Sequence, residues 1–194
     1  MKLLRFILEI DGKEIREIQF FNNLNIITSK KKSNAPGNSV GKSTLGRILD
    51  YLFDGSIKPI YIDEEFQTPK QEIEQLFTNS EVYVSLEYLG LDGQYSVIKR
   101  RLSTDKNLQS YILNGREVAS KEYISHIMAS IFNVYSAKPT IRKLAPKFFR
   151  TTQHRMTKTV NFDNSKNVSK SDTNTVFYIY LTLMTLKFSV KSIN

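Results

Sequence analysis

The sequence predicts an α/β fold in which antiparallel β-hairpins pack beside a buried strand and an amphipathic helix. Asp11-Gly12, Asp92-Gly93 and Asn114-Gly115 each lie between extended, largely apolar runs, and such pairs favour the tight turns of two-residue hairpins. Two other segments carry apolar residues at helical spacing. A short β-branched run, 24–28, ends just before a glycine-containing loop, as a buried strand would.

Composition limits the class of protein. The chain has 194 residues, of which 40% are hydrophobic and 24% charged, so one globular domain is expected. Cysteine is absent and there are two histidines, which excludes disulfides, thiolate metal sites and a histidine-rich metal site. The first 15 residues are interrupted by charge and predict a strand, not a signal peptide. We expect a cytoplasmic protein.

The net charge of +9 is unevenly distributed. Residues 1–100 carry 13 basic and 14 acidic side chains, whereas residues 101–194 carry 15 and 5. The basic region 138–158 could therefore bind DNA through its phosphates. A solvated basic face explains the same pattern equally well.

The first hairpin and the helix after the loop can be placed from periodicity. Leu4, Phe6, Leu8 and Ile10 alternate up to the first turn. The helix is predicted to start near Lys42 and to end at Asp54-Gly55, with Gly55 in the left-handed cap. Its apolar stripe is formed by Leu45, Ile48, Leu49, Leu52 and Phe53.

Two further helices are expected. In the first, Thr68 would be the N-cap, Pro69 the first helical residue and Gln71 the partner in a capping box. In the second, Ser120 would cap the helix and His126 would face solvent. The apolar stripe of the second helix is formed by Ile124, Ile127, Met128, Ile131 and Phe132.

The C-terminal part divides in two. Residues 156–175 are rich in Ser, Thr, Asn and Lys and predict a flexible polar linker or loop. Residues 176–194 form an apolar terminal segment, expected to be helical. Its apolar run, 176–188, is shorter than the roughly 20 residues of a membrane-spanning helix, so no membrane association is expected.

The loop "NSVGKST" (38–44) has the composition of a phosphate-binding loop. Lys42 would reach the β- and γ-phosphates of ATP and is the candidate catalytic residue, and the Ser43 hydroxyl would bind Mg²⁺. The pattern G-x-x-x-x-G-K-[ST] is incomplete because Pro36 replaces its first glycine, but that position makes only the first turn of the loop. The candidate nucleotide-binding residues are Asn38, Ser39, Val40, Gly41, Lys42, Ser43 and Thr44.

A P-loop hydrolase also needs an acidic residue at the end of a buried strand. The run "PIYIDEE" (59–65) is apolar before Asp63 and Glu64. It contains a proline and follows the predicted helix closely, so a surface segment is the preferred interpretation.

The order of these elements resembles the N-terminal half of the ABC-type ATPase heads of SMC, RecN and RecF proteins and their bacterial relatives. Asn38, Gly41, Lys42 and Ser43 match the loop of that family, and the hairpins ending in "YSVIKRRL" and "YILNGREV" follow it. The resemblance implies a P-loop NTPase lobe over residues 1–155, binding ATP and Mg²⁺. It also implies a magnesium-contacting glutamine, for which Gln153 is the candidate.

In that family a C-terminal half supplies the signature motif and the acidic strand, and two heads dimerise around nucleotide. The resemblance therefore implies a lobe that binds ATP but hydrolyses it only with its missing C-terminal half or a second head, in DNA repair, chromosome maintenance or anti-phage defence. Two alternatives stay open: a small P-loop kinase, and a basic nucleic-acid-binding module with a structural P-loop.

Overall fold

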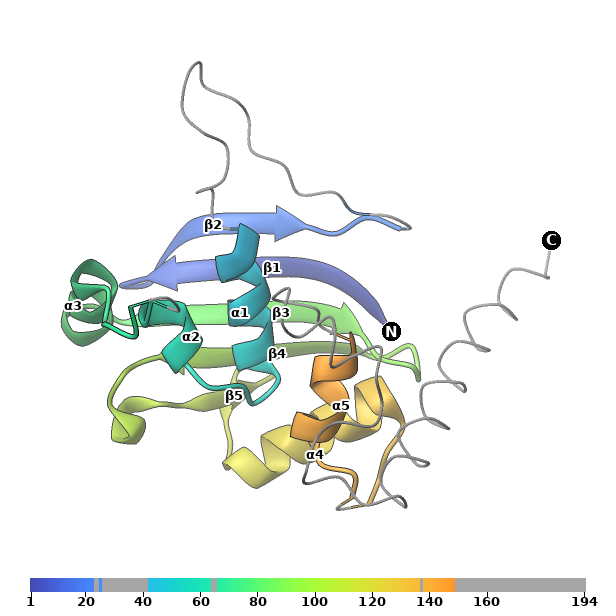
Figure 1. Cartoon of the computed structure of the whole chain (residues 1–194). Coiled ribbons are helices and arrows are strands. Elements are labelled where there is room, and N and C mark those ends of the chain that lie inside the picture. The colour runs from blue at the N-terminus through green and yellow to red at the C-terminus, as the bar shows by residue number, and fades with distance from the viewer. Residues whose placement is uncertain (23–24, 26–41, 64–65, 137, 149–194) are drawn as a thin grey trace.

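The computed structural model describes residues 1–22, 25, 42–63, 66–136 and 138–148. These residues form a mixed α/β structure around one six-stranded sheet, in the order β2-β1-β3-β4-β5-β6, and every neighbouring pair is antiparallel. Helix α1 crosses the strands on one face of the sheet, with α4 and α5 beside its end (Figure 1). The strands are β1 (Lys2–Ile10), β2 (Lys13–Gln19), β3 (Val82–Leu89), β4 (Tyr95–Leu102), β5 (Tyr111–Leu113) and β6 (Arg116–Glu117).

The three predicted hairpins are confirmed as β1–β2, β3–β4 and β5–β6. Asp11 and Gly12 have φ values of 49° and 75°, and Asn114 and Gly115 have 50° and 81°. Positive φ at both central residues is the type I′ conformation, whose twist matches that of the flanking strands. The β3–β4 hairpin differs, because Leu89 pairs with Tyr95 and residues 90–94 form a longer loop in which Gly93 (φ 75°) has a positive φ and Asp92 does not.

One core lies between the sheet and the helices. The register aligns Phe6 of β1 with Leu86 of β3 and Ile98 of β4, and these side chains pack with residues of α1, α4 and α5. The helices are α1 (Lys42–Leu52), α2 (Lys58–Tyr61), α3 (Gln71–Asn79), α4 (Ser120–Phe132) and α5 (Ile141–Phe148), with a 3₁₀ turn at Lys106–Leu108.

The opposite face of the sheet carries cross-strand ion pairs. Arg5 of β1 donates to Glu87 of β3 at 2.6 Å, and Lys99 of β4 pairs with Glu9 of β1. Arg5 and Glu87 face each other on neighbouring strands, where opposite charges stabilise a sheet modestly, whereas Lys99 reaches Glu9 across β3. The strands therefore alternate between apolar side chains that face the core and charged side chains that pair on this face.

A β-bulge changes the predicted alternation in β1. Leu3 pairs with Tyr88 and Arg5 with Glu87, which leaves Leu4 as the extra residue in the strand. Leu3 packs against the core in its place. A bulge inserts one unpaired residue and resets the faces on either side, so Leu3, and not Leu4, packs against the core together with Phe6.

The predicted apolar stripes of α1 and α4 are confirmed. Ile48, Leu52 and Phe53 from the first stripe are buried, and so are Ile127, Met128, Ile131 and Phe132 from the second. The end of α1 differs from expectation, because Asp54 (φ 63°) and not Gly55 takes the left-handed conformation. Gly55 is needed for close approach: a Cβ there would lie 2.5 Å from the Asp50 carbonyl oxygen.

Two predicted helix caps were wrong. The N-cap of α3 is Lys70, and its side chain makes no capping hydrogen bond; Pro69 instead pairs with Ile62 in an isolated β-bridge. The bridge places Pro69 outside the helix, so Gln71 opens the helix and cannot be the third residue of a capping box. At α4 the N-cap is Ala119, one residue before the expected Ser120.

The structure confirms the predicted α/β class but not the predicted P-loop NTPase fold. The mixed α/β architecture and the antiparallel hairpins beside α1 are present, but an antiparallel sheet is not typical of P-loop NTPases. The expected P-loop strand, 24–28, lies largely outside the described residues, as do the predicted linker 156–175 and terminal segment 176–194. Among the helices that the structure describes, none is long and apolar enough to cross a membrane.

Candidate functional site

The predicted phosphate loop meets the described structure at the start of α1. Lys42, Ser43 and Thr44 form the first turn of this helix, which confirms the expected helix start. No acidic residue lies in this turn, so no carboxylate of the helix itself would repel an anion there. Asn38, Ser39, Val40, Gly41 and the candidate magnesium ligand Gln153 lie outside the described residues.

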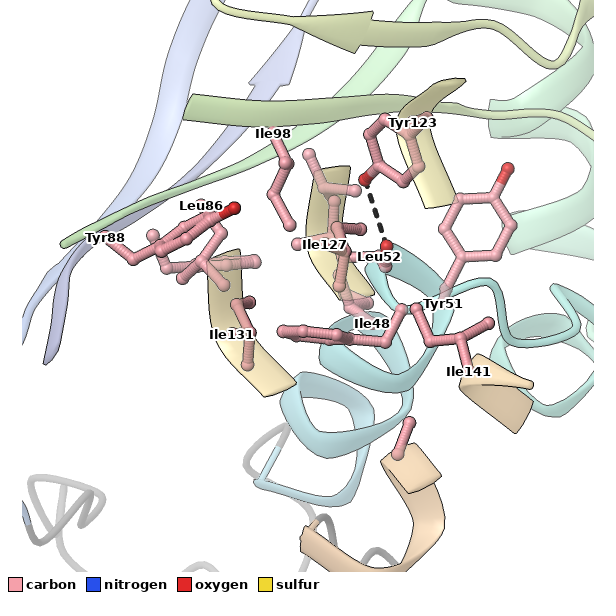
Figure 2. Close-up of a cluster of buried hydrophobic side chains, with 14 of the residues drawn as sticks. Ile48, Tyr51, Leu52, Leu86, Tyr88, Ile98, Tyr123, Ile127, Ile131 and Ile141 are labelled. Atoms are coloured by element: carbon pink, nitrogen blue, oxygen red, sulfur yellow. Dashed lines mark hydrogen bonds between the residues drawn. The ribbon is translucent and has the colours of Figure 1, made fainter. Parts of the chain in front are cut away.

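The opposite end of α1 is held by side chains from three other elements. Arg100 of β4 donates to the Tyr51 carbonyl oxygen, Tyr123 of α4 donates to that of Leu52 at 2.9 Å, and Arg142 of α5 donates to that of Phe53 at 3.2 Å. The last carbonyls of a helix have no partner within the helix and need donors from elsewhere. Figure 2 shows the Tyr123 hydroxyl pointing at Leu52.

Arg100 is a buried cation held between aromatic rings. It is 2% exposed, and its guanidinium carbon lies 3.8 Å from the Tyr51 ring centroid and 4.4 Å from that of Tyr111. Its Nη2 donates to the Tyr111 hydroxyl at 3.2 Å, whereas its Nε has no hydrogen-bond partner among the described residues. Stacking and carbonyl contacts offset part of the cost of burying this charge, and the charge faces the negative end of the helix dipole.

Burial shifts the ionisation of groups around Arg100. It raises the pKa of Tyr51 to about 12, although the charge of Arg100 partly opposes the shift, and it raises the pKa of Tyr123 as well. Both phenols therefore stay protonated and act as donors at neutral pH, Tyr51 to the carbonyl oxygen of Arg101 at 2.6 Å. Burial also raises the pKa of Asp54, against the attraction of Arg100 and Arg142.

Arg142 joins α5 to α1 through a two-point contact. Its Nη1 and Nη2 atoms lie 3.1 and 3.2 Å from the two carboxylate oxygens of Asp50, which is buried within α1. Such fork-to-fork pairs fix geometry as well as supplying energy. Arg142 belongs to the basic region 138–158, so within the described part of that region this arginine is engaged internally and does not form a free DNA-binding face.

His126 was expected to face solvent, and this was wrong. It is partly buried, with Nε2 3.1 Å from the Ser96 hydroxyl, and burial lowers its pKa although Asp92 opposes the shift. Ser130 donates to the His126 carbonyl oxygen and lies 2.9 Å from the Tyr88 hydroxyl. Because Ser96 is 3% exposed, this serine and histidine join α4 to the β3–β4 hairpin and do not form an open nucleophilic site.

The described part of 59–65 does not form the acidic strand of a P-loop hydrolase. Lys58–Tyr61 is helix α2, which lies outside the sheet and buries Ile60 in the core, so the expectation of a surface segment holds only in part. Asp63 accepts from the Phe66 amide at 3.2 Å and lies 3.8 Å from Lys70, so it serves a local turn. Within the described ranges no cluster of three or more His, Asp or Glu side chains could hold a metal ion.

The anchoring residues Arg100, Tyr123, Asp50 and Arg142 were missed from the sequence. The burial of Arg100 could have been predicted, because strand alternation places it between Ile98 and Leu102 on the apolar face of the strand. A scan against protein-family models and a search of curated proteins found no match to this chain.

Proposed function

We propose that the chain is the ATP-binding lobe of an SMC-like ATPase, with nucleotide bound at residues 38–44 and Mg²⁺ at Ser43. The observation that carries the proposal is the sequence Gly41-Lys42-Ser43-Thr44 at the opening of α1. Backbone amides at a helix start favour phosphate, and a lysine and a hydroxyl in that turn supply the charge and the magnesium ligand.

The surrounding structure supports a lobe more than a complete hydrolase. All described strands are antiparallel hairpin strands, and in the described ranges no buried strand ends in an acidic residue at the start of α1. We propose that hydrolysis needs a complementary half carrying that acidic strand, and a second head. DNA repair, chromosome maintenance and anti-phage defence are the processes in which heads of this kind act.

The small-kinase alternative is less well supported. Two antiparallel strands, β1 and β2, precede the loop, an order that resembles the ATPase heads and argues against a small kinase. The alternative of a basic nucleic-acid-binding module is weakened because Arg142, one of its basic residues, already pairs with Asp50. We therefore retain nucleotide binding as the proposed function.

Thermal denaturation with and without Mg²⁺-ATP tests the proposal. At a ligand concentration of 100 times Kd, binding to the native state adds about 2.7 kcal/mol of stability, which raises Tm measurably. Lys42→Ala should abolish this shift. Lys121→Ala is the matched control, since Lys121 is an exposed lysine in the first turn of α4; it should keep the shift.

The alternatives give different outcomes. Salt-sensitive DNA binding that is unchanged by ATP and by Lys42→Ala would replace nucleotide binding with the basic-module function. Phosphoryl transfer to a small acceptor would identify a kinase. Absence of any ATP-dependent shift in the wild-type chain would refute the proposed site.

A further inference from the structure

Helix α1 carries the proposed nucleotide site at one end and its tertiary anchors at the other. The anchors Arg100, Tyr123 and Arg142 all act on the carbonyls of residues 51–53. Lys42 and Ser43 lie in the first turn, ten and nine residues before Leu52. In Figure 1 the helix spans several strands between these two ends.

A small tilt of α1 at its anchored C-terminal end causes a larger displacement of its first turn, where the proposed nucleotide site lies. An 11-residue helix is about 16 Å long at 1.5 Å per residue. A tilt of about 4° around the C-terminal end therefore moves the first turn by about 1 Å. In a site that depends on positioned groups, a displacement of about 1 Å can reduce function on the order of 100-fold.

Arg142 differs from the other two anchors in what it contacts and in its exposure. It bonds both carboxylate oxygens of Asp50 and the Phe53 carbonyl oxygen, which lie on successive turns of the chain at the end of α1. Its side chain is 33% exposed, whereas Asp50 is buried. The contact thus limits both tilt and rotation of the helix, and Arg142 can be replaced with less loss of core packing than Arg100 or Tyr123.

We propose that Arg142 is a positioning residue for the nucleotide site: by fixing Asp50 and the end of α1 it sets the location of Lys42 and Ser43 and so the affinity for nucleotide. This inference rests on the proposed function. It assigns Arg142 no contact with nucleotide, and its effect is transmitted through α1.

The test measures the Kd of Mg²⁺-ATP for the full chain by calorimetry, at a temperature where circular dichroism shows each variant to be folded. Arg142→Met should raise Kd by at least about fivefold, the lower end of typical coupling between sites. Arg142→Lys should recover part of the affinity, because one ammonium group keeps the charge but cannot span both carboxylate oxygens. If the methionine variant is unfolded, the lysine variant and Asp50→Asn decide the question.

A matched control separates positioning from general stability. Arg116 of β6 pairs with Glu122 of α4, and both side chains are exposed, so Arg116→Met should leave Kd unchanged. In a double-mutant cycle, Asp50→Asn should add little to the effect of Arg142→Met on Kd, because both changes break one contact.

The outcomes distinguish the two proposals. Variants of Arg142 that lower Tm but keep the wild-type Kd would overturn the positioning role while leaving the nucleotide site intact. A wild-type chain that does not bind ATP, or a Lys42→Ala variant that binds it normally, would overturn the proposed function and the inference with it.

Discussion

Replacing Tyr123 with phenylalanine removes one buried hydroxyl group and leaves the ring in place. The hydroxyl donates to the Leu52 carbonyl oxygen at 2.9 Å, and both residues are fully buried. Water cannot take over the bond at this depth, so the carbonyl oxygen keeps its desolvation penalty. An unsatisfied buried acceptor costs about 1–3 kcal/mol, and we expect the free energy of unfolding to fall by that amount.

Urea denaturation followed by circular dichroism measures the effect as a lower midpoint with an unchanged m-value. In a chain of this size the loss corresponds to a Tm decrease of about 2–12 °C. Tyr135→Phe is the control, because Tyr135 is 84% exposed and a surface change of this kind stays within about 0.5 kcal/mol. A Tyr123→Phe variant within that same range of the wild type would refute the importance of this bond to the end of α1.

Two further changes test the packing around α1 and α4. Gly55→Ala would place a Cβ 2.5 Å from the Asp50 carbonyl oxygen, so we expect a loss of about 1–3 kcal/mol from overpacking; an unchanged Tm on heating would show that the backbone can move aside. Burial lowers the pKa of His126 from 6.5, so on acidification the unfolded chain binds a proton at this residue before the folded chain does. The free energy of unfolding should therefore be unaffected by His126 above pH 6.5 and should fall as the pH is lowered below that value. His126→Gln should flatten this dependence in urea denaturation between pH 8 and 5, and equal pH profiles for the two proteins would contradict it.

The sheet connections could be predicted because they depend on local chemistry. Asp-Gly and Asn-Gly pairs define the two-residue turns, and alternation around them sets which residues face the core. The bulge at Leu4 could not be predicted, since a bulge depends on the partner strand as well as on the strand that contains it. The same holds for the cap of α3, where pairing between Ile62 and Pro69 overrides the local capping signal.

The structure describes the candidate site only from Lys42 onward. The expectation that a helix begins near this residue is confirmed, and nucleotide binding itself stays a prediction. The contacts that hold the helix could not be found from the sequence, because they join distant positions: Arg100 to Tyr51, Tyr123 to Leu52 and Arg142 to Asp50. Charged residues are almost never fully buried unless paired, and the sequence does not show which partners the fold brings to them.

Several residues near the C-terminal end of α1 depart from the usual preferences for burial and backbone conformation. An arginine occupies the apolar face of β4, an aspartate takes a left-handed conformation that glycine would adopt more easily, and an acidic side chain is buried within a helix. Each is unfavourable by itself. The two buried charges are compensated in this arrangement, Arg100 by the aromatic rings around it and Asp50 by the two-point contact with Arg142. Hydrophobic packing alone would tolerate small shifts of α1 on the sheet, whereas a buried charge that has one set of hydrogen-bond partners does not. The polar contacts therefore favour one position of α1 on the sheet, which is what the proposed phosphate site in its first turn would require.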